Sequence, residues 1–146
     1  ADGGDGDSGL PADGGGGDAG EACPLPSGGV YATFLVTDDV FRAHITDADA
    51  IQQAIDLWQG NSNASIPNGD LICEPADFNC GYSWHLDPEN IEFAEVTVEV
   101  CDGSPSYIED NCEDFSVDYY CPWNAELIDL RDCSEPDCPQ VPRDPA

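Results

Sequence analysis

The residues in this sequence that could do chemistry are carboxylates placed two positions apart. We single out three of these pairs: Asp5 with Asp7, Asp47 with Asp49, and Asp87 with Glu89. Oxygen ligands at this spacing in turn-forming backbone can converge on a large, hard ion, so we expect these residues to bind Ca²⁺. Two plainer roles remain open, because Asp47 and Asp49 also suit the start of a helix, and the first pair also suits simple solvation.

The charge balance favours the same class of ligand. The chain has 31 Asp and Glu residues against three Arg and no Lys, which gives a formal net charge of −28. A chain this acidic repels nucleic acid and anionic membrane surfaces, so we exclude both as partners. Its self-repulsion destabilises a compact state unless cations collect on it, and solubility in a salty environment is the alternative reason for such a charge.

We predict that the protein is not an enzyme. His85 stands two residues before Asp87 and could act as a general base held by that carboxylate. No serine in a G-x-S-x-G frame and no H-E-x-x-H motif accompanies it. A structural histidine is therefore the preferred interpretation, and a secreted hydrolase using His85 is the weaker alternative.

Eight cysteines in so short a chain indicate a set of disulfides rather than a metal cluster, because only two histidines accompany them. Disulfides place the protein in an oxidising compartment, so we expect an extracellular or cell-surface location. Cys73 and Cys80 are close enough in sequence for a local bridge. The pairing of four others stays open from the sequence: Cys23, Cys112, Cys133 and Cys138. Asn63 begins an N-x-S sequon and could carry a glycan.

The first half of the chain predicts a hairpin followed by a helix. Residues 30–36 are rich in β-branched and aromatic side chains, and residues 40–45 alternate in polarity, which is typical of two strands joined by a turn at 37–39. Residues 46–60 place apolar side chains at helical spacing and end in glycine. A loop then leads to a short strand at 70–73.

The second half predicts more sheet. Residues 94–100 alternate valine with polar side chains, which indicates a strand with one buried face and a bulge near Phe93. Residues 104–111 begin with Ser-Pro, typical of a short helix, and 121–130 predict a last strand. We therefore expect an α+β fold, a mostly antiparallel sheet with one full and one short helix.

We divide the chain into an arm (1–22), a domain (23–133) and a Pro-rich acidic tail (134–146). The arm is almost entirely Gly, Asp and Ala, and Leu10 and Pro11 are its only large apolar anchors. Fully extended, it reaches about 75 Å, several times the radius of such a domain. We expect it to dock on neighbouring copies of the chain, and a plain flexible tether is the alternative.

Three short runs carry a resemblance to a known family: WHLDP at 84–88, EVCD at 99–102 and CPW at 121–123. With their flanking residues, about 30–133, they resemble the N-terminal domain of the calmodulin-binding-protein-like family of small exported domains. The resemblance implies an α+β fold and a Cys101–Cys121 disulfide. It implies no catalytic mechanism, and calmodulin binding does not follow here, because calmodulin targets are basic amphipathic helices.

Together these features predict an exported Ca²⁺-binding structural protein, a homopolymer subunit of an extracellular filament or surface assembly. The alternative is a tethered monomeric cell-surface module whose Trp84 and Trp123 form a ligand or carbohydrate surface.

Overall fold

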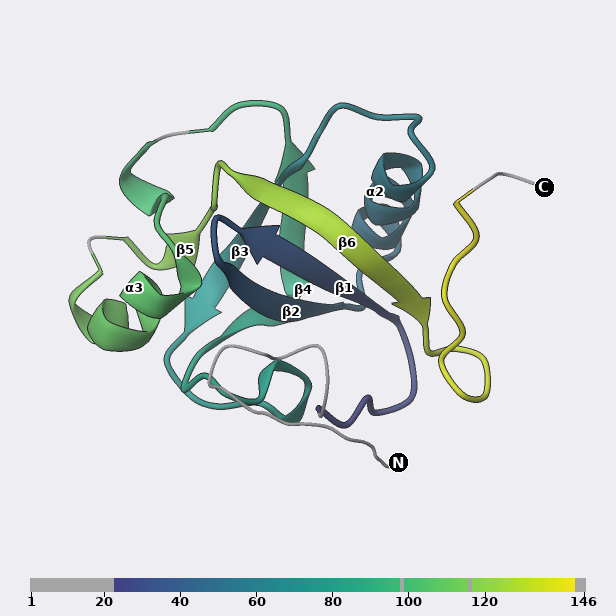
Figure 1. Cartoon of the computed structure of the whole chain (residues 1–146), viewed down its shortest axis with the longest axis horizontal. Coiled ribbons are helices and arrows are strands. Elements are labelled where there is room, and N and C mark those ends of the chain that lie inside the picture. Colours follow the sequence, from purple (N-terminus) through teal and green to yellow (C-terminus); the bar gives the residue numbers. More distant parts are fainter. Residues whose placement is uncertain (1–22, 98, 116, 144–146) are drawn as a thin grey trace.

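The structure, a computed structural model, describes residues 23–97, 99–115 and 117–143. Two small antiparallel sheets and two helices make up the fold (Figure 1). The strands are β1 (Val30–Val36), β2 (Asp39–Ile45), β3 (Ile66–Ile72), β4 (His85–Ala94), β5 (Tyr119–Tyr120) and β6 (Ala125–Asp132). The α-helices are α2 (Ala48–Trp58) and α3 (Pro105–Asn111), and single 3₁₀ turns lie at Asp77–Asn79, Glu99–Cys101 and Cys112–Asp114.

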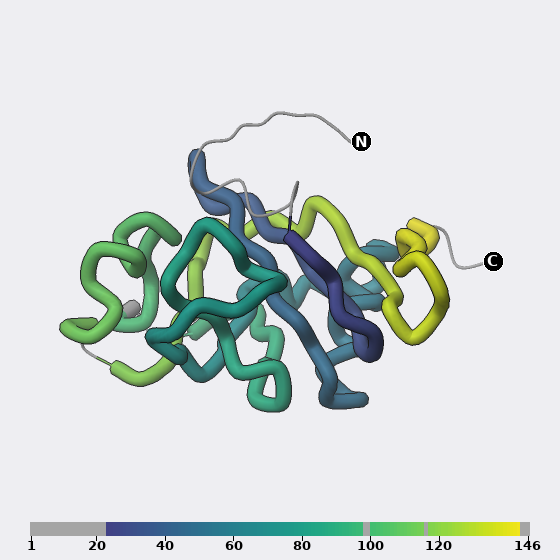
Figure 2. The backbone as a smooth tube through the Cα atoms, turned by 90° about the horizontal axis from the view of Figure 1, so that it is seen from below, coloured from purple at the N-terminus to yellow at the C-terminus, as the bar shows by residue number. Residues whose placement is uncertain are grey.

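We predicted one sheet, but the structure has two, and this corrects the α+β prediction. One has the order β2-β1-β6 and the other β4-β3-β5, each with three strands. They share one core, in which the Phe34 and Phe93 rings lie 6.1 Å apart and the Phe41 and Trp84 rings 5.4 Å apart. Figure 2, which turns the molecule by 90°, shows the same body from below.

The predicted hairpin is confirmed. β1 pairs with β2 along its whole length, and Thr37 takes a positive φ of 58° at the turn. β1 is also the centre of its sheet, so it buries side chains on both faces. Phe34 faces the shared core, whereas Tyr31 stacks on His44 with the ring centroids 4.2 Å apart.

The predicted helix is confirmed, and Asp47 caps it. α2 begins after Asp47, whose carboxylate accepts a hydrogen bond from the Ala50 N–H at 3.1 Å. This is the N-cap geometry that satisfies an otherwise free amide of the first turn. Ala50, Ala54 and Trp58 recur every four residues and are buried.

The strand predicted over 94–100 is wrong. β4 ends at Ala94, and Val96 and Val100 are 73% and 54% exposed. The core instead takes Ile91 and Phe93, each 5% exposed, which have the opposite alternation. Side chains along a strand point alternately to its two faces. Because Ile91 and Phe93 face the core, the valines of the opposite alternation cannot.

The bulge expected near Phe93 lies further back. Gly69 of β3 pairs with Ile91 and Leu71 pairs with Leu86, so the register shifts between Gly69 and Leu71 and four residues of β4 bow outward between Leu86 and Ile91. Gly69 permits this close pairing, since a Cβ there would lie 2.9 Å from Leu86 Cδ1. The bowed segment is 87–90, which includes two of the predicted cation ligands.

The short helix is confirmed as α3, with the Ser104 hydroxyl accepting from the Tyr107 N–H at 3.2 Å. Two strand boundaries differ from the prediction. β3 starts at Ile66 rather than at residue 70, and β6 starts at Ala125 rather than at residue 121.

Four disulfides tie the domain together. They are Cys23–Cys80, Cys73–Cys112, Cys101–Cys121 and Cys133–Cys138. Cys101 and Cys121 are joined, as the family resemblance implies. No helix in the described part of the chain has the length and apolar composition needed to cross a membrane.

The local Cys73–Cys80 bridge expected from the sequence is wrong. Between these residues the 3₁₀ turn is fixed by Asn79, which accepts from the Arg42 N–H at 3.0 Å and donates to the Trp84 carbonyl at 2.9 Å. The turn holds Cys80 beside Cys23, whereas Cys73, just past the end of β3, lies beside Cys112.

Candidate functional site

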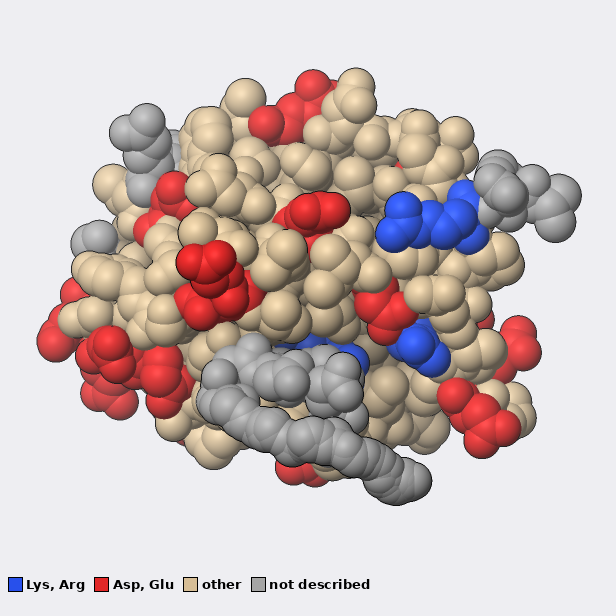
Figure 3. All heavy atoms as spheres, in the orientation of Figure 1, with Lys and Arg blue, Asp and Glu red and all other residues tan. Residues whose placement is uncertain are grey.

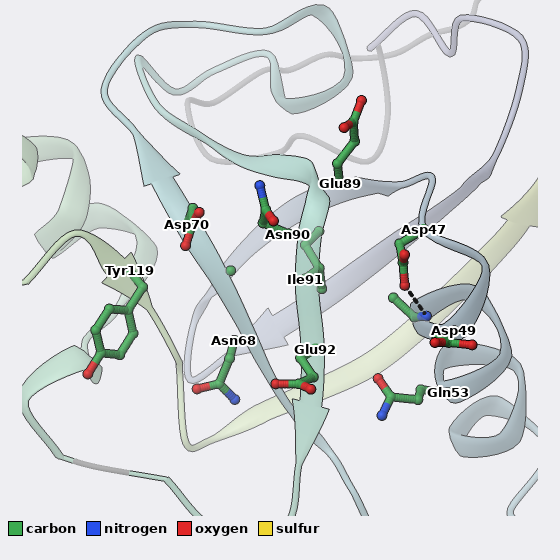
Figure 4. Close-up of a pocket in the computed structure, with 12 residues that line it drawn as sticks. Asp47, Asp49, Gln53, Asn68, Asp70, Glu89, Asn90, Ile91, Glu92 and Tyr119 are labelled. Carbon is green, nitrogen blue, oxygen red and sulfur yellow. Dashed lines mark hydrogen bonds between the residues drawn. The ribbon is translucent and has the colours of Figure 1, made fainter.

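Three of the predicted cation ligands lie around one hollow. Asp47, Asp49 and Glu89 line a cavity of about 430 Å³ between the start of α2 and the β3–β4 pair (Figure 4). Asp70 of β3 and Glu92 of β4 join them at its wall. Acidic residues from three different elements thus border one space, which we call the acidic hollow, and the Glu89 carboxylate points away from the other labelled side chains.

The bowed segment of β4 is what brings Glu89 to the hollow. The Asp87 carboxylate accepts from the Glu89 N–H at 3.1 Å and from the Asn90 side-chain amide at 2.8 Å. Thr46, just before α2, donates its N–H to the Pro88 carbonyl at 3.0 Å. Asp87 therefore shapes the bend and fixes it to the helix start, and its own side chain is not among the lining residues.

Amide side chains form the rest of the polar wall. The Gln53 carbonyl oxygen accepts from the Phe93 N–H at 3.0 Å, which joins α2 to β4 beneath the carboxylates. Asn68 accepts from the Thr97 hydroxyl at 3.0 Å. Figure 4 shows both amides at the lower part of the hollow with Glu92 between them. These groups add neutral oxygen atoms, which hard cations also accept as ligands.

All the charged side chains that line the hollow are acidic. None of its twelve lining residues is Lys or Arg, and five are acidic. Within the described ranges no three His, Cys, Asp or Glu side chains lie close enough together to hold a metal ion. The hollow is therefore negatively charged, but its carboxylates do not form a complete set of metal ligands.

Sequence reasoning missed Asp70, Glu92 and Asn68, because they reach the hollow through strand pairing rather than through local spacing. The Asn-Gly-Asp run at 68–70 is typical of a turn, yet it lies inside β3. The sequence therefore did not indicate that it lines the hollow. The first predicted pair, Asp5 with Asp7, and the arm anchors Leu10 and Pro11 lie outside the described residues. Asn63 is exposed on the loop after α2.

Both histidines have structural contacts. His85 Nδ1 lies 2.7 Å from the Glu74 carbonyl oxygen, and the ring packs edge-on against Phe78. His44 Nε2 lies 2.9 Å from the Gly28 carbonyl oxygen. Burial lowers the pKa of His44, which favours the neutral ring with its N–H directed at that carbonyl.

Trp84 does not form part of a ligand surface, which corrects one element of the alternative function. Its side chain is fully buried between Tyr82, Phe41 and Tyr120. Trp123 is only partly buried, beside the Cys101–Cys121 disulfide.

The comparisons with known proteins agree with this picture of the domain. The family model described as the BP-74 N-terminal domain matches residues 30–134, from the first residue of β1 to just beyond β6. This confirms the family resemblance carried by the sequence. No curated protein and no solved structure matches the chain.

Proposed function

Since the chain belongs to the BP-74 N-terminal domain family, we propose that it is an exported, Ca²⁺-binding structural protein that assembles with copies of itself. The acidic hollow is the observation that carries the Ca²⁺ part of this proposal. The location rests on the disulfides, because four of them in one small domain suit an oxidising compartment outside the cytosol.

The chemistry of the hollow favours Ca²⁺ over softer metals. Its walls offer carboxylate and amide oxygens, and no cysteine or histidine is among its lining residues. Ca²⁺ accepts such oxygens in irregular geometry and keeps some water ligands. In this proposal one or two carboxylates, Asn68, Gln53 and water together hold the ion weakly, as in sites of extracellular domains.

The charge of the chain supports a role for Ca²⁺ in the proposed assembly. A formal charge of −28 makes two copies repel one another, and a divalent cation on the acidic surface lowers that repulsion. In this proposal Ca²⁺ permits contact, and the arm at 1–22 makes it. A tethered monomeric module that binds Ca²⁺ without assembling is the second candidate, supported by the same hollow.

Neutralising the hollow should weaken Ca²⁺ binding by about tenfold or more, a loss of about 1.4 kcal/mol. The variant is Asp49→Asn with Glu89→Gln and Glu92→Gln; Asp47 is kept because it caps α2. The matched control removes the same number of charges from exposed residues elsewhere, as Asp110→Asn with Glu113→Gln and Glu126→Gln. Isothermal titration of the full chain with CaCl₂ measures both.

The control variant should bind Ca²⁺ within about twofold of the parent chain, because it leaves the hollow intact. Equal weakening in the two triple variants would mean that Ca²⁺ is held only as a diffuse counterion cloud, and the hollow would then have no specific role.

A further inference from the structure

A second cavity lies on the opposite side of α2 and is mostly apolar. It measures about 530 Å³ and is bordered by the helix, the start of β1 and the C-terminal segment 139–142. Six apolar side chains line it: Val30, Ile51, Ile55, Pro139, Val141 and Pro142. Ile51 and Ile55 lie on the apolar face of α2, and both are only partly buried. We call this cavity the strap groove.

The C-terminal segment is anchored by hydrogen bonds to β6 and α2, so it forms one wall of the strap groove. The Val141 N–H donates to the Leu130 carbonyl at 2.8 Å, and the Trp58 indole N–H donates to the Val141 carbonyl at 2.6 Å. The Cys133–Cys138 disulfide closes the turn that leads into this segment. The segment thus bridges β6 and the end of α2, and the groove is a built feature of the domain.

The positive charge of the surface lies beside this groove. Arg42 is 4% exposed, so the exposed cations among the described residues are Arg131 and Arg143. Arg131 is joined to Gln140 of the groove wall by a β-bridge and forms an ion pair with Asp129 at 3.0 Å. Arg143 stacks on Trp58 at 3.6 Å. Figure 3 shows basic side chains on the side where the C-terminal segment lies, with acidic groups close to them.

The arm has the complementary chemistry. Leu10 and Pro11 are its only large apolar residues, and three aspartates flank them at positions 5, 7 and 13. An apolar pair between acidic neighbours complements an apolar groove whose wall residues Gln140 and Pro142 adjoin Arg131 and Arg143. Asp132 and Glu135 also border the groove and keep their negative charge, and the Asp132 carboxylate accepts a hydrogen bond from the Ser134 hydroxyl at 2.6 Å.

The length of the arm permits docking on a second copy. The arm ends at Cys23, which the Cys80 disulfide fixes to the domain. Leu10 precedes Cys23 by 13 residues, a reach of about 45 Å when extended. This exceeds the radius of gyration of about 14 Å expected for a domain of this size, so Leu10 can reach beyond its own domain.

We propose that the strap groove is the acceptor site for the arm segment around Leu10 and Pro11 of a neighbouring copy. The origin of the arm in another copy rests on the assembly proposed above, whereas the fit between segment and groove rests on the groove itself. Leu10 and Pro11 fill the space over Ile51 and Ile55, and the flanking aspartates face Arg131 and Arg143.

Photo-crosslinking of the full chain tests this docking. Leu10 is replaced by p-benzoyl-phenylalanine, and equal amounts of ¹⁴N- and ¹⁵N-labelled protein are mixed in CaCl₂ and irradiated. Mass spectrometry should find crosslinks to Ile51, Ile55 or the 139–142 segment, in peptide pairs that join light to heavy chains. Adding Ile51→Asp should lower the yield about tenfold, because a carboxylate would border the apolar contact, whereas the exposed Gln52→Asp should leave it unchanged.

The outcomes separate the docking from the assembly. Crosslinks to the groove within single chains only would keep the groove as the arm's site but overturn assembly through it. Crosslinks spread over the surface, or the same map from p-benzoyl-phenylalanine at Ala19, would overturn the docking. The map from the parent chain decides this even where Ile51→Asp does not fold.

Discussion

Replacing Cys23 and Cys80 together by alanine is expected to lower the free energy of unfolding by about 4 kcal/mol. The two residues are 57 positions apart, the longest loop closed by any disulfide of the domain's described residues. Removing the bridge frees that loop in the unfolded chain and so restores its entropy. Urea unfolding followed by tryptophan fluorescence gives the difference.

The matched control is the double alanine variant of Cys133 and Cys138, whose bridge closes a loop of only five positions, and its loss should cost about 2 kcal/mol. Equal losses in the two variants would show that loop entropy does not govern these bridges. The Cys23–Cys80 variant has a further use, because it releases the anchor from which the arm departs.

Trp84→Ala is expected to cost about 3–5 kcal/mol, as for other large aromatic side chains removed from a core. The ring is fully buried and lies 5.3–5.4 Å from three aromatic neighbours, Tyr82, Phe41 and Tyr120. Its removal leaves a cavity where the two sheets meet. Thermal unfolding of the full chain with all disulfides intact measures this loss.

Trp123→Ala is the comparison, since Trp123 is only partly buried at the edge of a smaller cluster. It should cost clearly less than Trp84→Ala. A small effect of Trp84→Ala together with a large effect of Trp123→Ala would contradict the core described here. It would favour the alternative in which Trp84 forms part of a ligand surface.

Local patterns in the sequence predicted the elements that depend on neighbouring residues. The 30–45 hairpin, α2 and α3 are each specified by side-chain alternation, helical spacing or a capping serine within the element itself. The strand at 94–100 failed because two alternations of opposite phase meet at Phe93, and only burial against the other sheet selects Ile91 and Phe93. The division into two sheets likewise depends on which strands meet in space.

In the candidate site, too, local sequence identified some residues, whereas others depend on which strands meet in space. Asp47, Asp49 and Glu89 were identified because each belongs to a local pair, and the structure brings them to one hollow. Asp87 was also identified, but its carboxylate is used to fold the bend that presents Glu89. Asp70 and Glu92 could not be found, because strand pairing and the register shift at Gly69 place them there.

The central claim is that Ca²⁺ and the arm together drive assembly. Negative-stain imaging of the purified full chain in CaCl₂ and again after EGTA tests it, alongside a chain that begins at Cys23 and so keeps all four disulfides. We expect ordered assemblies for the full chain in CaCl₂ alone, and dispersed particles after EGTA or without residues 1–22. Dispersed single particles of the full chain in CaCl₂ would contradict the account and favour a tethered monomeric module.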